Sequence, residues 1–298
     1  MSTATANDLA ASAAQLRAYR SPFQQFWRRF RRNKLALLAT VYLVVIYVVA
    51  ATAPLISPHS PEEISLLNRL GNPSVENLLG TDENGRDVLS RLLYGSQVSM
   101  TLGLLAVILA VTIGTVLGAV SGYFGGRTDA VIMRFTDAML VLPSFFLALL
   151  VLAVFGPSIG NVIAVIGLTQ WMVVARVVRS EVLRTLPQEF VNAARALGAN
   201  HLRIIVHHIL PQAVPSLIVA STLGVAHAIL TESSLSYLGL GVQPPAASWG
   251  SMLSAAQNYI WTKPILAVYP GVLILLSVLA FNSLGDALRD ALDPNYID

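Results

Sequence analysis

The 298-residue sequence contains no cysteine, only two lysines and only 12% charged residues. The absence of cysteine excludes disulfides, thiolate catalysis and cysteine-ligated metal sites. Ordinary soluble domains carry about 25% charged residues, whereas 55% of this chain is apolar and its mean hydropathy is +0.65. Such a chain cannot cover a water-facing surface, which excludes a soluble enzyme, a disordered protein and a nucleic-acid-binding domain. The composition predicts a polytopic membrane protein.

Long runs without charge mark the membrane spans. They cover residues 35–61, 92–126, 138–175, 209–231 and 264–285, and the first is most apolar over Leu35–Ile56. A helix needs about 20 apolar residues to cross the hydrocarbon core, so the run 138–175 is too long for one span. Gly156, Pro157 and Ser158 divide it. The sequence therefore predicts an all-α protein with six transmembrane helices.

The distribution of basic residues predicts the orientation of the spans. Arg and Lys are concentrated before the first span, in two later loops and in the C-terminal tail, all on one side. The other side holds Arg69, Arg86, Arg91 and Lys263. Because positively charged loops stay in the cytoplasm, both termini are predicted to be cytoplasmic. Residues 35–298 then form the transmembrane domain, with an outer loop at 57–95.

Residues 1–34 are predicted to be a cytoplasmic tail that ends in a basic amphipathic helix. Phe23, Phe26, Trp27 and Phe30 recur at helical spacing, and arginines lie between them. This pattern is typical of a helix that lies on anionic membrane lipid. The helix serves either as a topology anchor or as a regulatory docking element.

Three features inside the spans predict helix packing and shape. A glycine at every fourth position from Gly114 to Gly122 permits close packing of helices in lipid. Pro143 is expected to kink or divide the third span. Arg134 and Asp137, near the inner end of that span, can pair three residues apart.

The cytoplasmic loop at 179–213 is predicted to hold two short helices with a corner at Gly198. Thr185 and Gln188 have the spacing of a capping box for the first helix, and the glycine ends it. Its face at helical spacing is formed by Phe190, Ala193, Ala194 and Leu197. The two helices either insert into a groove of a partner protein or rest on lipid headgroups.

The second helix of this loop is predicted to be capped by Asn200 and interrupted by Pro211. The residues that line one face at helical spacing are Leu202, Ile205, Val206 and Ile209.

The loop sequence NAARALGA, followed by HILP, resembles the EAA loop of binding-protein-dependent ABC importers. In that family the loop forms a coupling helix that docks into the ATPase subunit. The resemblance implies an ATPase-coupling surface, whose candidate residues are Glu189, Asn192, Ala193, Ala194, Gly198 and Leu202. Asn192 stands where the family has glutamate, and His208 stands where it has isoleucine. Glu189, one turn earlier, is the candidate for the missing charge.

Two further segments, Leu78–Ser96 and Ser233–Gly250, resemble signatures of the C-type permease subunit of dipeptide and oligopeptide transporters. The resemblance implies a type I ABC importer permease fold in a bacterial plasma membrane. It implies three kinds of partner: a second homologous permease subunit, two ATPase subunits and an extracytoplasmic peptide-binding protein. Related permeases carry nickel chelates or glutathione, which are alternative substrates.

The sequence lacks the motif that binds ATP. A P-loop places a lysine after a glycine-rich turn, and neither Lys34 nor Lys263 lies in one. We therefore expect a non-catalytic subunit that binds no cofactor, with ATP and Mg held by partner subunits. The histidines share no obvious ligand face and no catalytic set is visible, so neither metal nor catalytic residues are predicted.

Glu232 and His227 are the candidate residues of a translocation path. An ionisable group inside a membrane helix is a candidate functional site, and the Glu232 carboxylate could meet the amino group of a peptide. In the alternative, Glu232 lies near the outer interface, bonded to Ser233, Ser234 or a neighbouring helix. A secondary transporter driven by ions is the competing class, but it is expected to contain inverted repeats and several buried carboxylates. The sequence shows no clear repeat and one candidate carboxylate.

Overall fold

The computed structural model of the protein describes residues 22–292. Within that range all regular secondary structure is helical, apart from one isolated β-bridge between Thr81 and Asp87, which confirms the all-α class. The α-helices are α2 (Pro22–Arg32), α3 (Lys34–Ile56), α4 (Val88–Phe124), α5 (Gly126–Val141), α6 (Ser144–Phe155), α7 (Ile159–Thr185), α8 (Glu189–Ala196), α9 (His201–Arg203), α10 (Leu210–Tyr237), α11 (Trp249–Ala256) and α12 (Ile265–Leu292). Two 3₁₀ turns, η1 (Leu66–Asn68) and η3 (Gln257–Tyr259), and a π-helical segment, η2 (Ile204–Ile209), complete them.

In this part of the chain, five helical runs are long and apolar enough to cross a membrane: α3, α4, α7, the run His201–Tyr237 and α12. The predicted third span is a bent pair, because α5 and α6 meet at 83°. Pro143 lies at the bend, where its ring and missing N–H are incompatible with a continuous helix. Counted as one span, the pair gives the six that the sequence predicts. The next break lies at Gly156, as predicted, and the Ser158 side chain caps α7.

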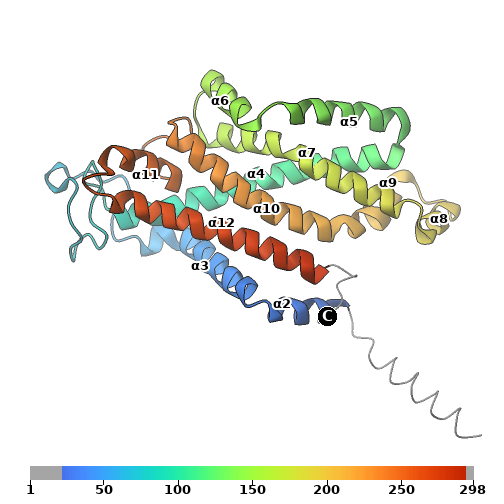
Figure 1. Ribbon diagram of the computed structural model, residues 1–298, viewed down its shortest axis with the longest axis horizontal. Coiled ribbons are helices and arrows are strands. Elements are labelled where there is room, and N and C mark those ends of the chain that lie inside the picture. The colour runs from blue at the N-terminus through green and yellow to red at the C-terminus, as the bar shows by residue number, and fades with distance from the viewer. Residues whose placement is uncertain (1–21, 293–298) are drawn as a thin grey trace, which may run out of the picture.

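Figure 1 shows the long helices lying side by side along the bundle. One end, here called the α11 end, carries α11 and the loop that follows α3; the opposite end, the α8 end, carries α8 and α9. The loop ends at Asp87 rather than at residue 95, because the Asp87 side chain caps α4 by accepting a hydrogen bond from the Ser90 N–H. The ends of the bundle are therefore built by different segments of the chain.

Helix α2 packs against the α8 end of α12. Phe30 lies in a buried cluster with Ala36, Ala287 and Ala291, while Trp27 is exposed. The helix is therefore amphipathic, with one face on the bundle. Residues 1–21 of the predicted tail lie outside the described residues.

Helices α4 and α7 form the most extensive helix contact of the bundle. A Cβ built on Gly114 would lie 2.6 Å from Val174 Cβ and 2.7 Å from the Trp171 carbonyl oxygen. A Cβ built on Gly118 would lie 2.9 Å from Val178 Cβ and closer still to a carbonyl oxygen of α7. The regularly spaced glycines thus let the two backbones approach more closely than any side chain would allow, as their spacing predicts.

We predict that Gly118→Ala lowers the free energy of unfolding by about 1–3 kcal/mol, because the added methyl group overpacks the α4–α7 contact. Thermal unfolding of the purified chain in detergent measures this change. Gly271→Ala is the matched control, since a Cβ at Gly271, also inside a helix, meets nothing within 4 Å. Equal unfolding temperatures for the two variants would contradict the close contact.

Candidate functional site

Helix α8 projects from the α8 end of the bundle as a short, exposed helix (Figure 1). It ends as predicted at Gly198, which has φ of +82°. The Gly198 N–H donates to the Arg195 carbonyl at 3.0 Å and the Ala199 N–H donates to the Ala194 carbonyl at 3.1 Å. These two bonds make a Schellman motif, which satisfies the last carbonyls of the helix and needs a residue that tolerates positive φ. Leu197, at the tip, is 89% exposed.

The prediction of a capping box at the start of α8 is wrong. Helix α7 continues through Thr185, and Gln188 takes the capping position without a side-chain hydrogen bond. Val191 alone anchors α8 to the bundle with a buried side chain, packing with the cluster that includes Val182 and Ile209. The helix is therefore held by its two ends and one valine, and the rest of its surface is open.

The second helix of the loop is not a separate short helix. Asn200 caps it as predicted, by accepting from the Arg203 N–H at 2.8 Å. Pro211 does not interrupt it, because a π-helical segment precedes the proline and the Leu210 N–H reaches back to the Ile205 carbonyl. The wider turn places the proline in the first turn of α10, where its missing N–H costs little.

The π-helical segment also changes which side chains of the second helix are buried. Ile204 and Ile209, five residues apart, are buried, whereas Leu202 and Val206 on the predicted face are exposed. A pattern read with 3.6 residues per turn fails where the turn is wider.

The six candidate coupling residues lie on or beside α8. Glu189, Asn192, Ala193 and Gly198 are exposed, and Ala194 is half-buried. Leu202 is exposed on the following helix, beyond the corner. The fold thus brings the six together at one end of the bundle, on a surface that has no partner within the described part of the chain.

Ion pairs and a tyrosine contact join the helices that surround α8. Arg179 of α7 makes two 2.6 Å hydrogen bonds to the Asp129 carboxylate of α5. Asp137 pairs with Arg176 at 2.6 Å, not with Arg134 as the sequence suggested, because the facing α7 brings a guanidinium within reach. The Tyr123 hydroxyl lies 2.8 Å from His201 Nδ1. These contacts join α4, α5, α7 and α9 near the α8 end.

A cavity of about 1230 Å³ opens between the bent pair α5–α6 and helices α7 and α10. Most of its wall is apolar, and its polar side chains are Ser144, Thr169, Gln170, Ser180, Glu181, Arg184, Gln212, Ser216, His227 and Arg289. Glu181 accepts a 2.6 Å hydrogen bond from Ser216 across the cavity, and it pairs with Arg184. His227, a candidate pathway residue from the sequence, lines the cavity. Gln170 and Glu181 also line the cavity but were not among the candidate residues from the sequence. The signal for Gln170 was an amide side chain inside the apolar run 138–175.

Glu232 does not line this cavity. Its side chain is fully buried, and Oε1 accepts hydrogen bonds of 2.7 Å from both Ser236 and Ser248. Ser233 contributes a longer contact of 3.5 Å to Oε2. Because Ser248 caps α11, the carboxylate joins α10 to the start of α11. Glu232 therefore has the kind of partners expected in the alternative to a pathway role, namely Ser233 and a residue at the start of a neighbouring helix, although Ser234 is not among them.

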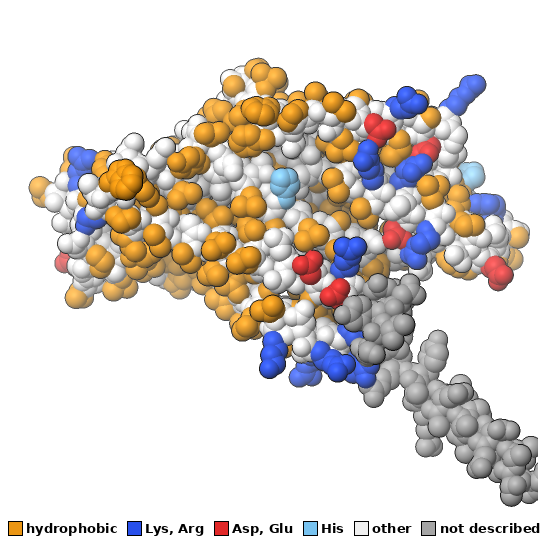
Figure 2. Space-filling model, viewed as in Figure 1, with side chains coloured by type: hydrophobic (Ala, Val, Ile, Leu, Met, Phe, Trp, Pro, Cys, Tyr) orange, Lys and Arg blue, Asp and Glu red, His pale blue; other side chains and the backbone are white. Residues whose placement is uncertain are grey.

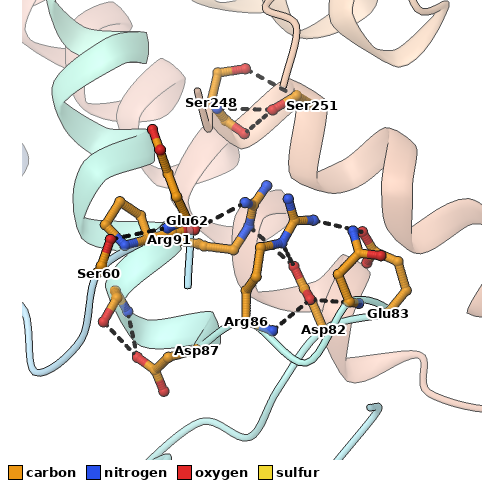
Figure 3. Close-up of polar contacts among 12 residues, drawn as sticks. Ser60, Glu62, Asp82, Glu83, Arg86, Asp87, Arg91, Ser248 and Ser251 are labelled. Carbon is orange, nitrogen blue, oxygen red and sulfur yellow. Dashed lines mark hydrogen bonds and ion pairs between the residues drawn. The ribbon is translucent and has the colours of Figure 1, made fainter. Parts of the chain in front are cut away.

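The α11 end holds a network of buried charges (Figure 3). Arg86 donates to Asp82 Oδ2 at 2.7 Å and to Glu83 Oε1 at 2.8 Å, and Arg91 Nε lies 3.3 Å from the same Asp82 oxygen. Asp82, Arg86 and Arg91 are all buried, so the pairs are shielded from water. The network fixes the loop after α3 onto the first turns of α4.

Comparisons with known proteins agree with a helical membrane bundle that carries an exposed α8. Residues 110–298 match the family of binding-protein-dependent transport system inner membrane components. The chain belongs to that family. It is an ABC importer permease subunit, and residues 21–73 match the N-terminal TM domain of oligopeptide transport permease C.

This permease is similar in sequence to permeases of two peptide transport systems. It is 41% identical to the dipeptide transport system permease protein DppC of Alkalihalophilus pseudofirmus, over 92% of this chain and 90% of the relative. It is 42% identical to the glutathione transport system permease protein GsiD of Escherichia coli, over 92% and 91%. A crystal structure of an amino acid ABC transporter with histidines shares the fold, with TM-score 0.51 and 18% identity over 68% of this chain and 92% of that chain.

We predict that Glu232→Ala lowers the free energy of unfolding of the permease by about 3 kcal/mol, because the buried hydroxyls of Ser236 and Ser248 lose their acceptor. Glu232→Gln keeps a carbonyl acceptor and is expected to lose less than half as much. Ser234→Ala is the control, since that exposed hydroxyl donates only to a carbonyl of its own helix. Thermal unfolding in detergent compares the three. A Glu232→Ala variant as stable as the control would show that the carboxylate does not hold α11.

Proposed function

We propose that this permease is the membrane-spanning subunit of an ATP-driven importer of dipeptides or oligopeptides. The observation that carries the proposal is the 41% identity to a dipeptide permease over 92% of the chain. Glutathione, itself a short peptide, is the second candidate, because a glutathione permease is 42% identical over a similar length. A nickel chelate and ion-coupled secondary transport are the remaining alternatives, and no relative named above supports them.

The proposed orientation puts the α8 end in the cytoplasm of a bacterial cell, with both chain termini on that side. Figure 2 supports it, since Lys and Arg gather over the α8 end and α2 while the middle of the bundle is largely hydrophobic. Positively charged segments stay on the cytoplasmic side of a membrane. Residues 1–34 would then be the cytoplasmic tail, and residues 35–298 the transmembrane domain.

In this proposal, α8 docks into a groove of an ATPase subunit. The exposed tip at Leu197 and the small residues Ala193 and Ala194 allow a partner backbone to approach closely. Glu189 and Asn192 add a polar edge, and Gly198 and Leu202 form the corner. ATP and Mg belong to two such ATPase subunits, because this sequence has no P-loop.

Two further partners complete the proposed importer. A second, homologous permease subunit would close the cavity wall between α5–α6 and α10 into a central path, in which His227 is the candidate residue of this chain. Glu232, the other candidate from the sequence, is buried away from this cavity and is not part of the proposed path. An extracytoplasmic peptide-binding protein would dock on the α11 end. The buried charge pair of Arg86 and Asp82 supports this role, because it gives the partner a rigid surface.

Helix α7 provides the mechanical link between ATP and substrate. It lines the cavity from Thr169 to Arg184 and then leads directly into α8. When ATP draws the ATPase subunits together, displacement of α8 would tilt α7 and turn the cavity from the cytoplasm to the outside. The shift requires that ATP bind the closed arrangement more tightly than the open one.

We predict that Leu197→Asp abolishes co-purification of the ATPase subunits, because a charge at the tip of α8 cannot enter an apolar groove without losing its hydration. The permease should still insert and unfold at the same temperature, since Leu197 is exposed. Leu67→Asp, at a fully exposed leucine of the α11 end, is the control and should retain the ATPase. Retention by the Leu197 variant would place the docking surface elsewhere.

Uptake into proteoliposomes tests the substrate and the energy source together. We expect the complete complex, with ATP and a loaded binding protein, to accumulate a labelled dipeptide, and the two permease subunits alone to accumulate none. Accumulation of glutathione but not of dipeptides would favour the second candidate. Uptake by the permease alone would favour a secondary transporter.

A further inference from the structure

One polar side chain in the wall of the cavity has a donor that is not used. Gln170 lines the cavity, yet its Nε2 is buried and has no hydrogen-bond partner among the described residues. An unmade hydrogen bond of a buried donor is unfavourable by about 1–3 kcal/mol. A leucine at this position would avoid that cost in a membrane protein, so packing alone does not explain a glutamine.

The neighbouring threonine shows the contrast. Thr169 also lines the cavity, but its hydroxyl donates to the Val165 carbonyl at 2.9 Å, within its own helix. The threonine is therefore satisfied without a ligand. Gln170 has a longer side chain and reaches away from the α7 backbone towards α10.

The facing surface of α10 leaves room at the glutamine. A Cβ built on Gly224 would lie 3.6 Å from Gln170 Oε1, so the glycine keeps space open beside the amide. His227, one turn along α10, is exposed and lines the same cavity. The amide and the imidazole thus come from the two helices that face each other across the cavity.

Gln170 lies at a depth in the membrane where transporters commonly bind their substrates. It lies about 16 Å along α7 from Ile159, at 1.5 Å per residue, which is close to half of a 30 Å hydrocarbon core. Substrate sites of membrane transporters are typically near the midplane. Polar side chains at this depth are unfavourable unless they meet a partner.

We propose that the Gln170 carboxamide, with His227 opposite, is a subsite that binds the backbone of a peptide during its passage. A carboxamide offers one N–H donor side and one carbonyl acceptor, which match the carbonyl and N–H of a single peptide group. Rotation about the last side-chain bond, which has a broad two-fold preference, turns the donor towards the cavity. The subsite would bind the peptide group and not the side chains, so it could bind peptides of varied sequence. This inference rests on the proposed peptide transport.

Gln170→Leu tests the subsite in the complete complex in proteoliposomes. We expect uptake of a labelled dipeptide to fall about tenfold, the net effect of losing two modest hydrogen bonds, while ATP hydrolysis stimulated by the loaded binding protein changes less than twofold. The unfolding temperature should stay equal or rise, because the substitution removes an unsatisfied donor. Thr112→Val is the matched control and should transport as the unchanged permease does, because the Thr112 hydroxyl likewise donates within its own helix and does not line the cavity.

A second substrate separates backbone recognition from a general loss of activity. In an ester analogue of the dipeptide, oxygen replaces the peptide N–H, so one of the two bonds to Gln170 is absent. The fall caused by Gln170→Leu should therefore be several-fold smaller for the ester than for the dipeptide, a ratio in which any preference of the binding protein cancels.

Three results would overturn the subsite: unchanged dipeptide uptake by Gln170→Leu, an equal fall for ester and dipeptide, or a lower unfolding temperature with loss of assembly. The last result would make Gln170 a packing residue. If the unchanged complex transports no peptide at all, the proposed function fails instead. The two failures are therefore distinguishable.

Discussion

The close approach of α4 and α7 is the contact on which the remaining structure depends. Lipid gives no hydrophobic driving force between helices, so two membrane helices stay together through close packing and polar contacts. Gly114, Gly118 and Gly122 supply the close packing along much of α4. As a result, the two helices form one unit that reaches the loop network at the α11 end and the base of α8 at the other.

Polar contacts at both ends of this unit fix its neighbours. Near the α8 end, the pair of Arg179 and Asp129 holds α5 against α7. At the α11 end, Arg86 and Asp82 hold the loop after α3, while Glu232 joins α10 to the cap of α11. Within the cavity, Gln170 keeps a donor without a partner in the described part of the chain. Paired charges near the ends and an amide donor without a partner in the cavity wall are consistent with the proposed passage of a substrate through a rigid frame.

Features that depend on local sequence were predictable, and features that depend on facing helices were not. Hydropathy located the spans, and Gly156 and Gly198 marked helix ends, because backbone conformation at a glycine is a local property. The interruption expected at Pro211 does not occur, because the π-helical turn before the proline lets the helix continue. Asp137 was matched with the wrong arginine, and Gln170 was overlooked. The pairing of Asp137 depends on α7 facing α5, and the surroundings of Gln170 depend on α10 facing α7. No single segment of the sequence reveals which helices face each other.

The proposed importer works only if α8 transmits force from a separate ATPase. The chain contains no cysteine, so Leu197→Cys gives the permease one site for a photoreactive maleimide, which is attached before the other subunits of the importer are added. On irradiation, coupling through α8 predicts a single protein crosslink, to a subunit that carries a P-loop. The same label at Trp261→Cys, exposed at the α11 end, should give no such product. A label at residue 197 that attaches only to lipid or to the permease itself would contradict coupling through α8.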